Sequence, residues 1–219
     1  MADPRKRRSE NVPGNFFVDS TCIDCGMCFW MAGDTFREEN DMATVYHQPS
    51  TEMQLFEAAQ ALVSCPVGSI GTEKPIPQIK TAIESFPFPL AEDLFLTGFH
   101  SKKAYGATSY LLKHPDGNIM VDSPRFLGTL AKKIEALGGI KTIFLTHLDD
   151  IGDHDLYHKH FGCERVILKD DWNPGMGEMK SLRRYSFEWV LPGHGERYHA
   201  DEKTMKSELE KCIAWMETR

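Results

Sequence analysis

The sequence has no long apolar run. No stretch of its 219 residues approaches the roughly 20 consecutive apolar residues that a membrane-spanning helix needs. The N-terminus lacks the apolar core of a secretory signal, and its polar segment is short for a transit peptide. We therefore expect a cytoplasmic protein without a membrane partner, although the mature form of a protein of the plastid stroma would look similar.

An excess of basic residues is also lacking. The chain carries 25 Lys and Arg against 32 Asp and Glu, a net charge of −7, whereas nucleic-acid binders usually present a basic face. The one basic run, Arg5–Arg8, lies in a polar segment, 1–12, that we expect to be a flexible tail. The sequence therefore predicts no nucleic-acid partner. Nor does it contain a Gly-rich phosphate loop or the G-x-S-x-G turn of serine hydrolases.

Cysteine is scarce but concentrated. Three of the six cysteines fall within seven residues, as Cys22-x2-Cys25-x2-Cys28, and Cys65 stands before Pro66. This spacing suits metal or cluster ligation better than a disulfide framework. Structural zinc is the rival, but zinc sites favour paired C-x2-C units over a triple run. The remaining two are expected to be small buried apolar residues: Cys163 and Cys212.

With the sequence CPVGSI after the triple run, residues 13–72 resemble the single-cluster ferredoxin family. Ferredoxins with two clusters place a further cysteine four residues after the third one, and that position is Ala32 here. The pattern therefore predicts one [4Fe–4S] cluster held by Cys22, Cys25, Cys28 and Cys65. Around it, Gly26 would let backbone N–H groups approach the cluster sulfurs, and four apolar side chains would exclude water: Ile23, Phe29, Phe36 and Ile70.

The rest of the chain predicts a second domain. Residues 73–92 are interpreted as a linker with one short helix around Ile79–Ser85, and residues 93–219 as the domain itself. Hydrophobic periodicity and turn signals predict strands at 94–99, 107–114, 118–123, 141–145, 164–169 and 187–191. Helices are expected at 51–65, 129–137, 153–161 and 202–216.

One loop of this second domain carries metal-ligating residue types. Residues 146–154 read THLDDIGDH directly after an apolar strand, and VLPGHG follows later at 190–195. Together with ATSYLLKHPDGNIMVDSP and TIFLTH, these segments resemble the metallo-β-lactamase superfamily, whose metal loop is H-x-H-x-D-H. The resemblance implies that Asp122 supports the site, that Asp153 is the best candidate for a catalytic residue, and that the ligands are His147, Asp149 or Asp150, Asp153, His154 and His194.

The resemblance implies one or two divalent metals, iron, manganese or zinc. A carboxylate in place of the second histidine favours iron or manganese over zinc, and flavodiiron oxidoreductases of the superfamily similarly place an acid there. The alternative is an acidic turn without metal, in which Asp153 caps the following helix. Because the TH, DH and PGHG elements occur in family order, we favour an origin as a metal site.

The second domain lacks parts that this family normally has. No histidine occurs between Phe161 and Gly193, so the third histidine and the bridging aspartate are missing. Residues 93–219 number only 127, whereas a two-sheet sandwich needs roughly 200. The domain is either a shortened family member or the product of an exon-skipped or misassembled gene, and its enzymatic activity is left open.

These observations predict an α+β protein in which a ferredoxin-like module precedes an incomplete αββα metallo-β-lactamase-like domain. The first hypothesis for its function is an oxidoreductase, in which the iron–sulfur module transfers electrons to or from the second metal site. The second is a metal-dependent hydrolase of thioester, lactone or glyoxalase-like type with a structural cluster. The third is a non-catalytic electron carrier. The expected partner is a redox protein or a small-molecule substrate, and the oligomeric state is open.

Overall fold

The computed structural model describes residues 2–167, 189–190 and 198–217. The N-terminal half contains η1 Pro4–Lys6, β1 Phe16–Val18, α1 Met27–Met31, β2 Phe36–Glu38, β3 Ala43–Val45, α2 Glu52–Ser64, β4 Ile70–Thr72 and α3 Gln78–Ser85. The second half begins with β5 Phe88–Ala91, β6 Leu94–Leu96, η2 Lys102–Ala104, β7 Tyr110–Leu112, β8 Ile119–Val121 and α4 Gly128–Ala136. It continues with β9 Thr142–Leu145, η3 Leu148–Asp150, α5 His154–Phe161, β10 Glu164–Ile167, β11 Trp189–Val190, β12 Tyr198–His199 and α6 Glu202–Glu217. The fold is therefore mixed α and β, as the sequence predicts.

Two small antiparallel sheets and one long helix build the N-terminal half. Strand β1 pairs with β4, and β2 pairs with β3. Helix α2 begins at a capping box in which the Thr51 hydroxyl accepts from the Gln54 backbone N–H and the Gln54 side chain accepts from the Thr51 N–H, so two otherwise unpaired donors are satisfied. Alanines on the inner face of α2 pack among buried apolar residues of the strands: Phe16, Val18, Phe36 and Val45.

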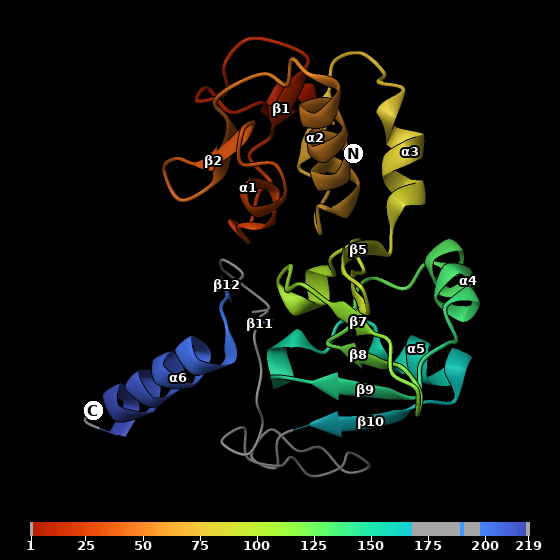
Figure 1. Cartoon of the computed structure of the whole chain (residues 1–219). Coiled ribbons are helices and arrows are strands. Elements are labelled where there is room, and N and C mark those ends of the chain that lie inside the picture. The colour runs from red at the N-terminus through yellow and green to blue at the C-terminus, as the bar shows by residue number, and fades with distance from the viewer. Residues whose placement is uncertain (1, 168–188, 191–197, 218–219) are drawn as a thin grey trace.

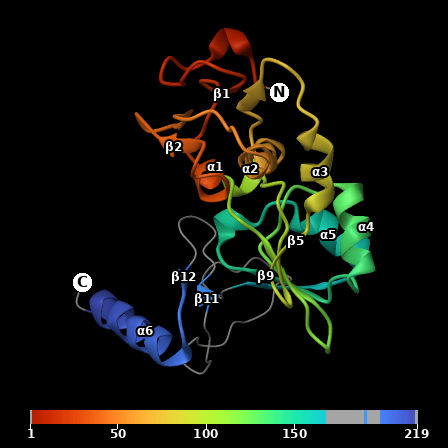
Figure 2. The same ribbon diagram turned by 45° about the horizontal axis from the view of Figure 1, so that its top comes forward.

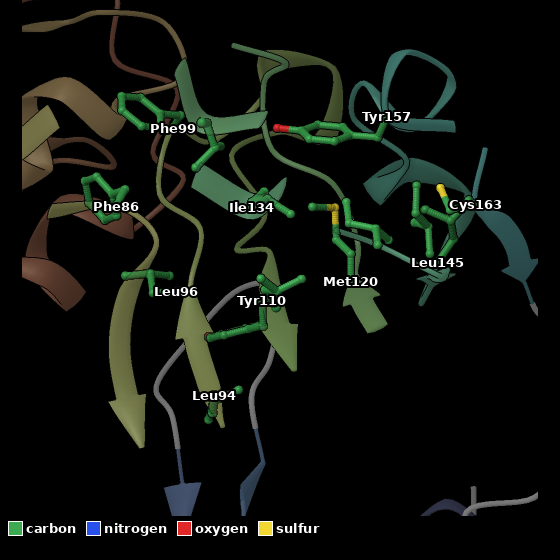
Figure 3. Close-up of a cluster of buried hydrophobic side chains, with 14 of the residues drawn as sticks. Phe86, Leu94, Leu96, Phe99, Tyr110, Met120, Ile134, Leu145, Tyr157 and Cys163 are labelled. Atoms are coloured by element: carbon green, nitrogen blue, oxygen red, sulfur yellow. The ribbon is translucent and has the colours of Figure 1, made fainter. Parts of the chain in front are cut away.

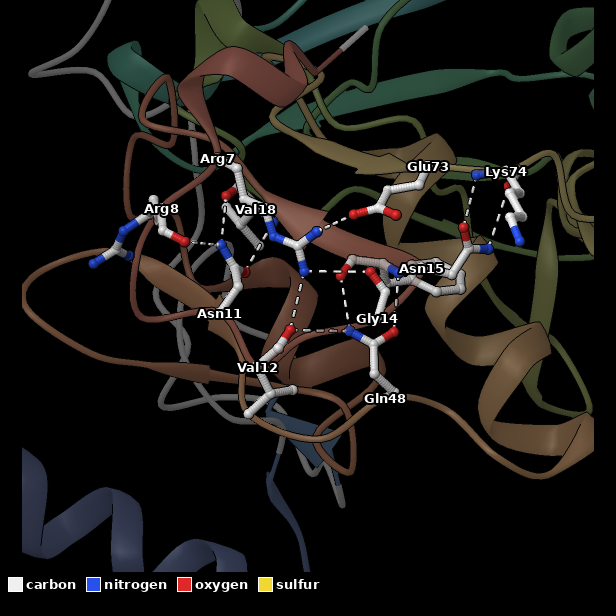
Figure 4. A network of polar contacts seen from close by, with 11 residues as sticks. Arg7, Arg8, Asn11, Val12, Gly14, Asn15, Val18, Gln48, Glu73 and Lys74 are labelled. Carbon is white, nitrogen blue, oxygen red and sulfur yellow. Dashed lines mark hydrogen bonds and ion pairs between the residues drawn. The ribbon is translucent and has the colours of Figure 1, made fainter.

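The segment expected to be a flexible tail packs on this half instead (Figure 4). The Arg8 guanidinium donates to the carbonyls of Ala43 and Glu39, each at 2.7 Å. Arg7 forms an ion pair with Glu73, at the far end of the domain sequence. The basic run looks solvated in the sequence, but backbone carbonyls distant in the sequence accept hydrogen bonds from the Arg8 side chain. Residues 2–12 are thus part of the domain.

A six-stranded sheet forms the centre of the second half, in the order β10-β9-β8-β7-β6-β5. Strands β5 to β8 are antiparallel neighbours, whereas β8, β9 and β10 are parallel. Its core contains fully buried side chains from the strands, including Tyr110, Met120 and Leu145, and receives Ile134 from α4 and Tyr157 from α5 (Figure 3). In the described part of the chain, β11 and β12 form a separate two-stranded pair.

The expected linker is largely structured. Helix α3 confirms the short helix predicted there and packs along α2. The following residues form β5, which joins the second-half sheet as its outermost strand. Its Pro89 hides the strand from sequence reading, because proline cannot donate to a sheet ladder, but an edge position tolerates it.

The two halves are stacked directly on one another (Figures 1 and 2). The Ser64 carbonyl, at the end of α2, accepts from the backbone N–H of His100 at 3.1 Å, and the Ser64 hydroxyl accepts from Phe99 N–H at 3.3 Å. The end of α2 that carries the fourth cysteine is therefore held by the second half. Among the described helices, none has the length and apolar character needed to cross a bilayer.

Candidate iron–sulfur site and acidic loop

The four predicted cluster cysteines line one cavity in the N-terminal half. Cys22 and Cys25 lie in the loop after β1, Cys28 lies in α1, and Cys65 ends α2. Cys28 is buried and the other three are half-buried. The structure thus brings together at one place side chains that are up to 43 positions apart in the sequence.

Local backbone geometry turns these side chains toward the cavity. Gly26 precedes α1 with a φ of 79°, a left-handed conformation that glycine adopts without steric cost. At the other side, Cys65 leaves the helical conformation, and the Ser69 hydroxyl lies 3.4 Å from its Sγ. Ser69 belongs to the CPVGSI segment, whose turn brings Ile70 back into β4. The turn therefore fixes Cys65 and contributes a polar neighbour to its sulfur.

The donor set fits an iron–sulfur cluster. Burial, with smaller contributions from the neighbouring Cys65 and Cys22 thiols, raises the pKa of the Cys25 thiol to about 11. Burial likewise raises the pKa of Cys28 well above its ordinary value. Four thiolates can occupy this cavity only with compensating positive charge, which cluster irons provide.

Single-ion coordination fits these cysteines less well. In the part of the chain that the structure describes, no three His, Cys, Asp or Glu side chains gather closely enough to hold one metal ion. A zinc ion needs its four ligands around one point, whereas each cysteine of a [4Fe–4S] cluster binds a different iron.

Water exclusion around the cavity differs in one respect from expectation. Phe36 and Ile70 are buried, with exposures of 1% and 4%, as predicted. Ile23, however, is 39% exposed, and so is Trp30 on the following helix. Ile23 nevertheless lines the cavity together with the four cysteines, so it shields this site only in part, which the spacing of the cysteines does not reveal.

A loop of the second half covers the Cys25 side of the cavity. Gly106 has a φ of +84°, and a Cβ built on it would lie 2.7 Å from Cys25 Cβ and 2.9 Å from its Sγ. The Gly106 backbone therefore lies directly against the sulfur-bearing side chain. Nearby, the Thr108 hydroxyl lies 3.0 Å from Met27 Sδ. The sequence gives no signal for Gly106, because its importance arises only from the contact between the halves.

The acidic loop begins at the end of β9 and is anchored by Asp122. The Asp122 carboxylate accepts from Thr146 N–H at 2.8 Å and from Thr146 Oγ1 at 2.9 Å. Burial raises the pKa of Asp122 to about 6, although the Thr146 hydrogen bonds oppose this rise. The next residue, His147, accepts from Asp149 N–H at its Nδ1. Asp122 thus supports the loop structurally, in the position that the sequence suggests.

Asp153 forms bonds to two other segments of the second half. Its carboxylate receives Lys103 Nζ at 2.7 Å and Phe126 N–H at 2.9 Å. Burial alone would raise the pKa of Asp153, but these hydrogen bonds and the Lys103 charge hold it below its ordinary value. Its side chain makes no capping hydrogen bond to α5. The carboxylate therefore links η2, the segment before α4 and the start of α5.

The remaining candidates differ in their exposure. The His147 and Asp149 side chains are exposed, at 55% and 66%, whereas His154 is buried, with its Nδ1 3.4 Å from an Arg165 guanidinium nitrogen. Burial lowers the pKa of His154. Among the described candidates, which also include Asp150, no three converge on one point. His194 lies outside the described residues, so the second metal site stays a prediction.

Comparison with protein families places the N-terminal half. Residues 18–72 match the model described as the 4Fe-4S single cluster domain of Ferredoxin I. They include all four cluster cysteines and lie within the predicted range 13–72. This part of the chain is therefore a single-cluster [4Fe–4S] ferredoxin domain, and the ferredoxin prediction is confirmed. None of the curated proteins compared with the chain matches it.

Metallo-β-lactamases are among the solved structures to which the chain is similar. One, from Cronobacter sakazakii, has 17% identity and a TM-score of 0.34 over 46% of this chain and 47% of that one. Another, from Legionella gormanii, has 21% identity and a TM-score of 0.30 over 45% and 37%. A third, a B3 metallo-β-lactamase with an active-site glutamic acid, has 16% identity and a TM-score of 0.33 over 55% and 54%. The chain spans about half the length of these proteins or less.

Proposed function

We propose that this protein is an electron-transferring oxidoreductase module, in which a cluster held by Cys22, Cys25, Cys28 and Cys65 serves the second half of the chain. A bound [4Fe–4S] cluster accepts and donates single electrons at a potential set by its surroundings. The observation that carries the proposal is the contact of the Gly106 backbone with Cys25. Through this contact the second half lies against a predicted cluster ligand and not at the end of a free linker.

The residues around the cavity favour a redox site over a purely structural one. Cys28 is buried, and the Ser69 hydroxyl is close enough to Cys65 Sγ for a hydrogen bond. Burial and hydrogen bonds to the ligand sulfurs are the means by which proteins adjust cluster potentials. The half-buried Cys22 and the exposed Ile23 leave one side close to solvent, where a redox partner could approach.

A short path joins the cavity to the acidic loop. From Cys25 it passes through Gly106 and η2 to Lys103, whose ammonium contacts Asp153. Covalent fusion and direct packing give the two halves a high effective concentration for one another. The described residues do not present three ligands to a second metal, so the proposal assigns no reaction step to one. Iron, manganese or zinc at the acidic loop with His194 stays a prediction.

The contacts of Asp153 favour a second candidate function. Because its carboxylate is already bound by Lys103 and Phe126 N–H, the acidic loop fits a structural role as well as a catalytic one. In that case the chain is an electron carrier whose second half shields the cluster and takes no part in chemistry.

Metal analysis with EPR on anaerobically purified protein tests both candidates. We expect four irons per chain and, after reduction with dithionite, the EPR signal of a reduced [4Fe–4S] cluster that titrates with one electron. Cys65→Ser should lose iron and signal, whereas Cys163→Ser, which alters a buried cysteine in the other half, should keep both. Further iron or manganese with its own EPR signal supports the oxidoreductase, and four irons alone support the carrier. Zinc together with ester or thioester hydrolysis would overturn both in favour of a hydrolase.

A further inference from the structure

One loop of the second half contacts both Cys25 and the acidic loop 146–154. This cover loop, Ser101–Ala107, contacts Cys25 through Gly106 and reaches Asp153 through Lys103. Only 11% of the Asp153 side chain is exposed, whereas 70% of the Lys103 side chain is. Asp153 is therefore held within the fold, and Lys103 reaches it from the surface.

The cover loop is held together by its own hydrogen bonds. Ser101 O accepts from Ala104 N–H at 3.2 Å and from Gly106 N–H at 2.9 Å. Ala104 O accepts from Ala107 N–H at 2.7 Å, and Ser101 Oγ accepts from Lys103 N–H. Because these bonds link η2 to the turn at Gly106, a displacement at Lys103 is transmitted to Gly106.

We infer that Asp153 is a positioning residue that, through Lys103, keeps the cover loop seated on Cys25 and so limits the access of water to the cluster. This role rests on the proposed cluster but not on any electron transfer to the second half. It also explains why Asp153, predicted as a metal ligand, is bound to Lys103 and Phe126 N–H. The carboxylate thus acts on the iron–sulfur site indirectly, through Lys103 and the cover loop.

Releasing the cover loop should shift the reduction potential of the cluster in a definite direction. Reduction makes the cluster and its four thiolates more negative, and water stabilises the more highly charged state more strongly. Greater solvent access therefore shifts the reduction potential to more positive values. It also exposes the cluster to chelators. Removing a partly exposed ion pair of this kind should raise the fraction of molecules with the cover loop displaced about two- to fivefold.

The test uses the holoprotein and the double variant Lys103→Met/Asp153→Asn. This variant removes one positive and one negative charge, so the direct electrostatic effects on the cluster offset each other. We expect cluster bleaching by an iron chelator to be about two- to fivefold faster, and the midpoint potential to be more positive than in the wild type. Each single variant should bleach at about the rate of the double variant, because all three remove the same interaction.

Two further variants serve as a negative and a positive control. Lys102→Met changes the neighbouring exposed lysine of η2 and should leave the bleaching rate unchanged, whereas any shift in its midpoint potential measures the direct effect of losing one positive charge. Gly106→Ala, whose Cβ would collide with Cys25, should change both in the same direction as the double variant. Iron content and the urea unfolding midpoint are measured for every protein.

Three outcomes would overturn the inference. The double variant could keep the wild-type bleaching rate and potential, which would mean that the pair does not seat the loop. It could bleach faster at an unchanged potential and with a lower urea midpoint, which would leave only a stabilising role. Asp153→Asn alone could lose metal other than the cluster iron while Lys103→Met retains it, which would make Asp153 a ligand. None of these measurements uses an electron acceptor, so the proposed function can fail while the inference holds.

Discussion

The buried side chain of Asn11 should be essential to the N-terminal domain. Its Nδ2 donates to Arg8 O and Val18 O, each at 2.8 Å, and its Oδ1 accepts from Val18 N–H and Val45 N–H, each at 3.0 Å. One amide thus joins the N-terminal segment to β1 and β3 (Figure 4 shows its bonds to Arg8 and Val18). In the sequence it is an unremarked polar residue of the expected tail.

Asn11→Ala removes the acceptor of two buried N–H groups and the donor of two carbonyl bonds. Leaving a buried donor unsatisfied costs about 1–3 kcal/mol, so the two N–H groups predict a loss of about 3–4 kcal/mol after partial hydration of the space. The measurement is urea unfolding of the anaerobic holoprotein, followed by far-UV circular dichroism, with the slope compared to confirm that only the midpoint moves.

A matched control lies four residues further along. Asn15, just before β1, binds the residues after β4, donating to Lys74 O and accepting from Lys74 N–H, but at the exposed surface. Because water replaces these bonds, Asn15→Ala should cost less than about 1 kcal/mol. If the two substitutions prove equally mild, the N-terminal segment is not integrated in the way the structure indicates, and the reasoning fails.

Three other substitutions test the second half. Gly152→Ala should destabilise the protein by about 3 kcal/mol or more, because its Cβ would lie 2.0 Å from Ser123 O at a φ of +51°; thermal unfolding checks this, and an unchanged midpoint would contradict it. Burial raises the pKa of Asp122 from 3.8 to about 6. The protonated carboxyl therefore adds about 3 kcal/mol to the free energy of unfolding. This contribution is fully present below pH ~4 and is lost as the pH rises through about 6. Asp122→Asn, which can keep both Thr146 bonds, should flatten stability over this pH range, and a profile parallel to the wild type would refute the assignment. Leu130→Ala, at a position 1% exposed in the core, should lower the free energy of unfolding by about 2–5 kcal/mol, as measured by urea unfolding. A loss under about 1 kcal/mol would show that this part of α4 is loosely packed.

Much of the fold was predictable because it depends on local patterns. The helices α2, α3, α4, α5 and α6 and the strands β6 to β10 lie within or close to the predicted ranges. Periodicity, capping residues and turn signals are written in consecutive residues, so sequence reading detects them. Other features were not predicted, among them the ordered segment 2–12 and the strand β5. Both depend on hydrogen bonds to partners far away in the chain.

The sequence by itself determined the iron–sulfur site. The spacing of Cys22, Cys25 and Cys28, with Cys65 before proline, is a local chemical pattern, and it leads to the same four residues that line the cavity. The loop THLDDIGDH is equally evident in the sequence, but the partners that its side chains bind are not. Tertiary structure decided that Asp153 binds Lys103 and that Gly106 lies on Cys25. Ligand spacing is encoded along the chain, whereas a contact between two packed halves exists only after both have folded.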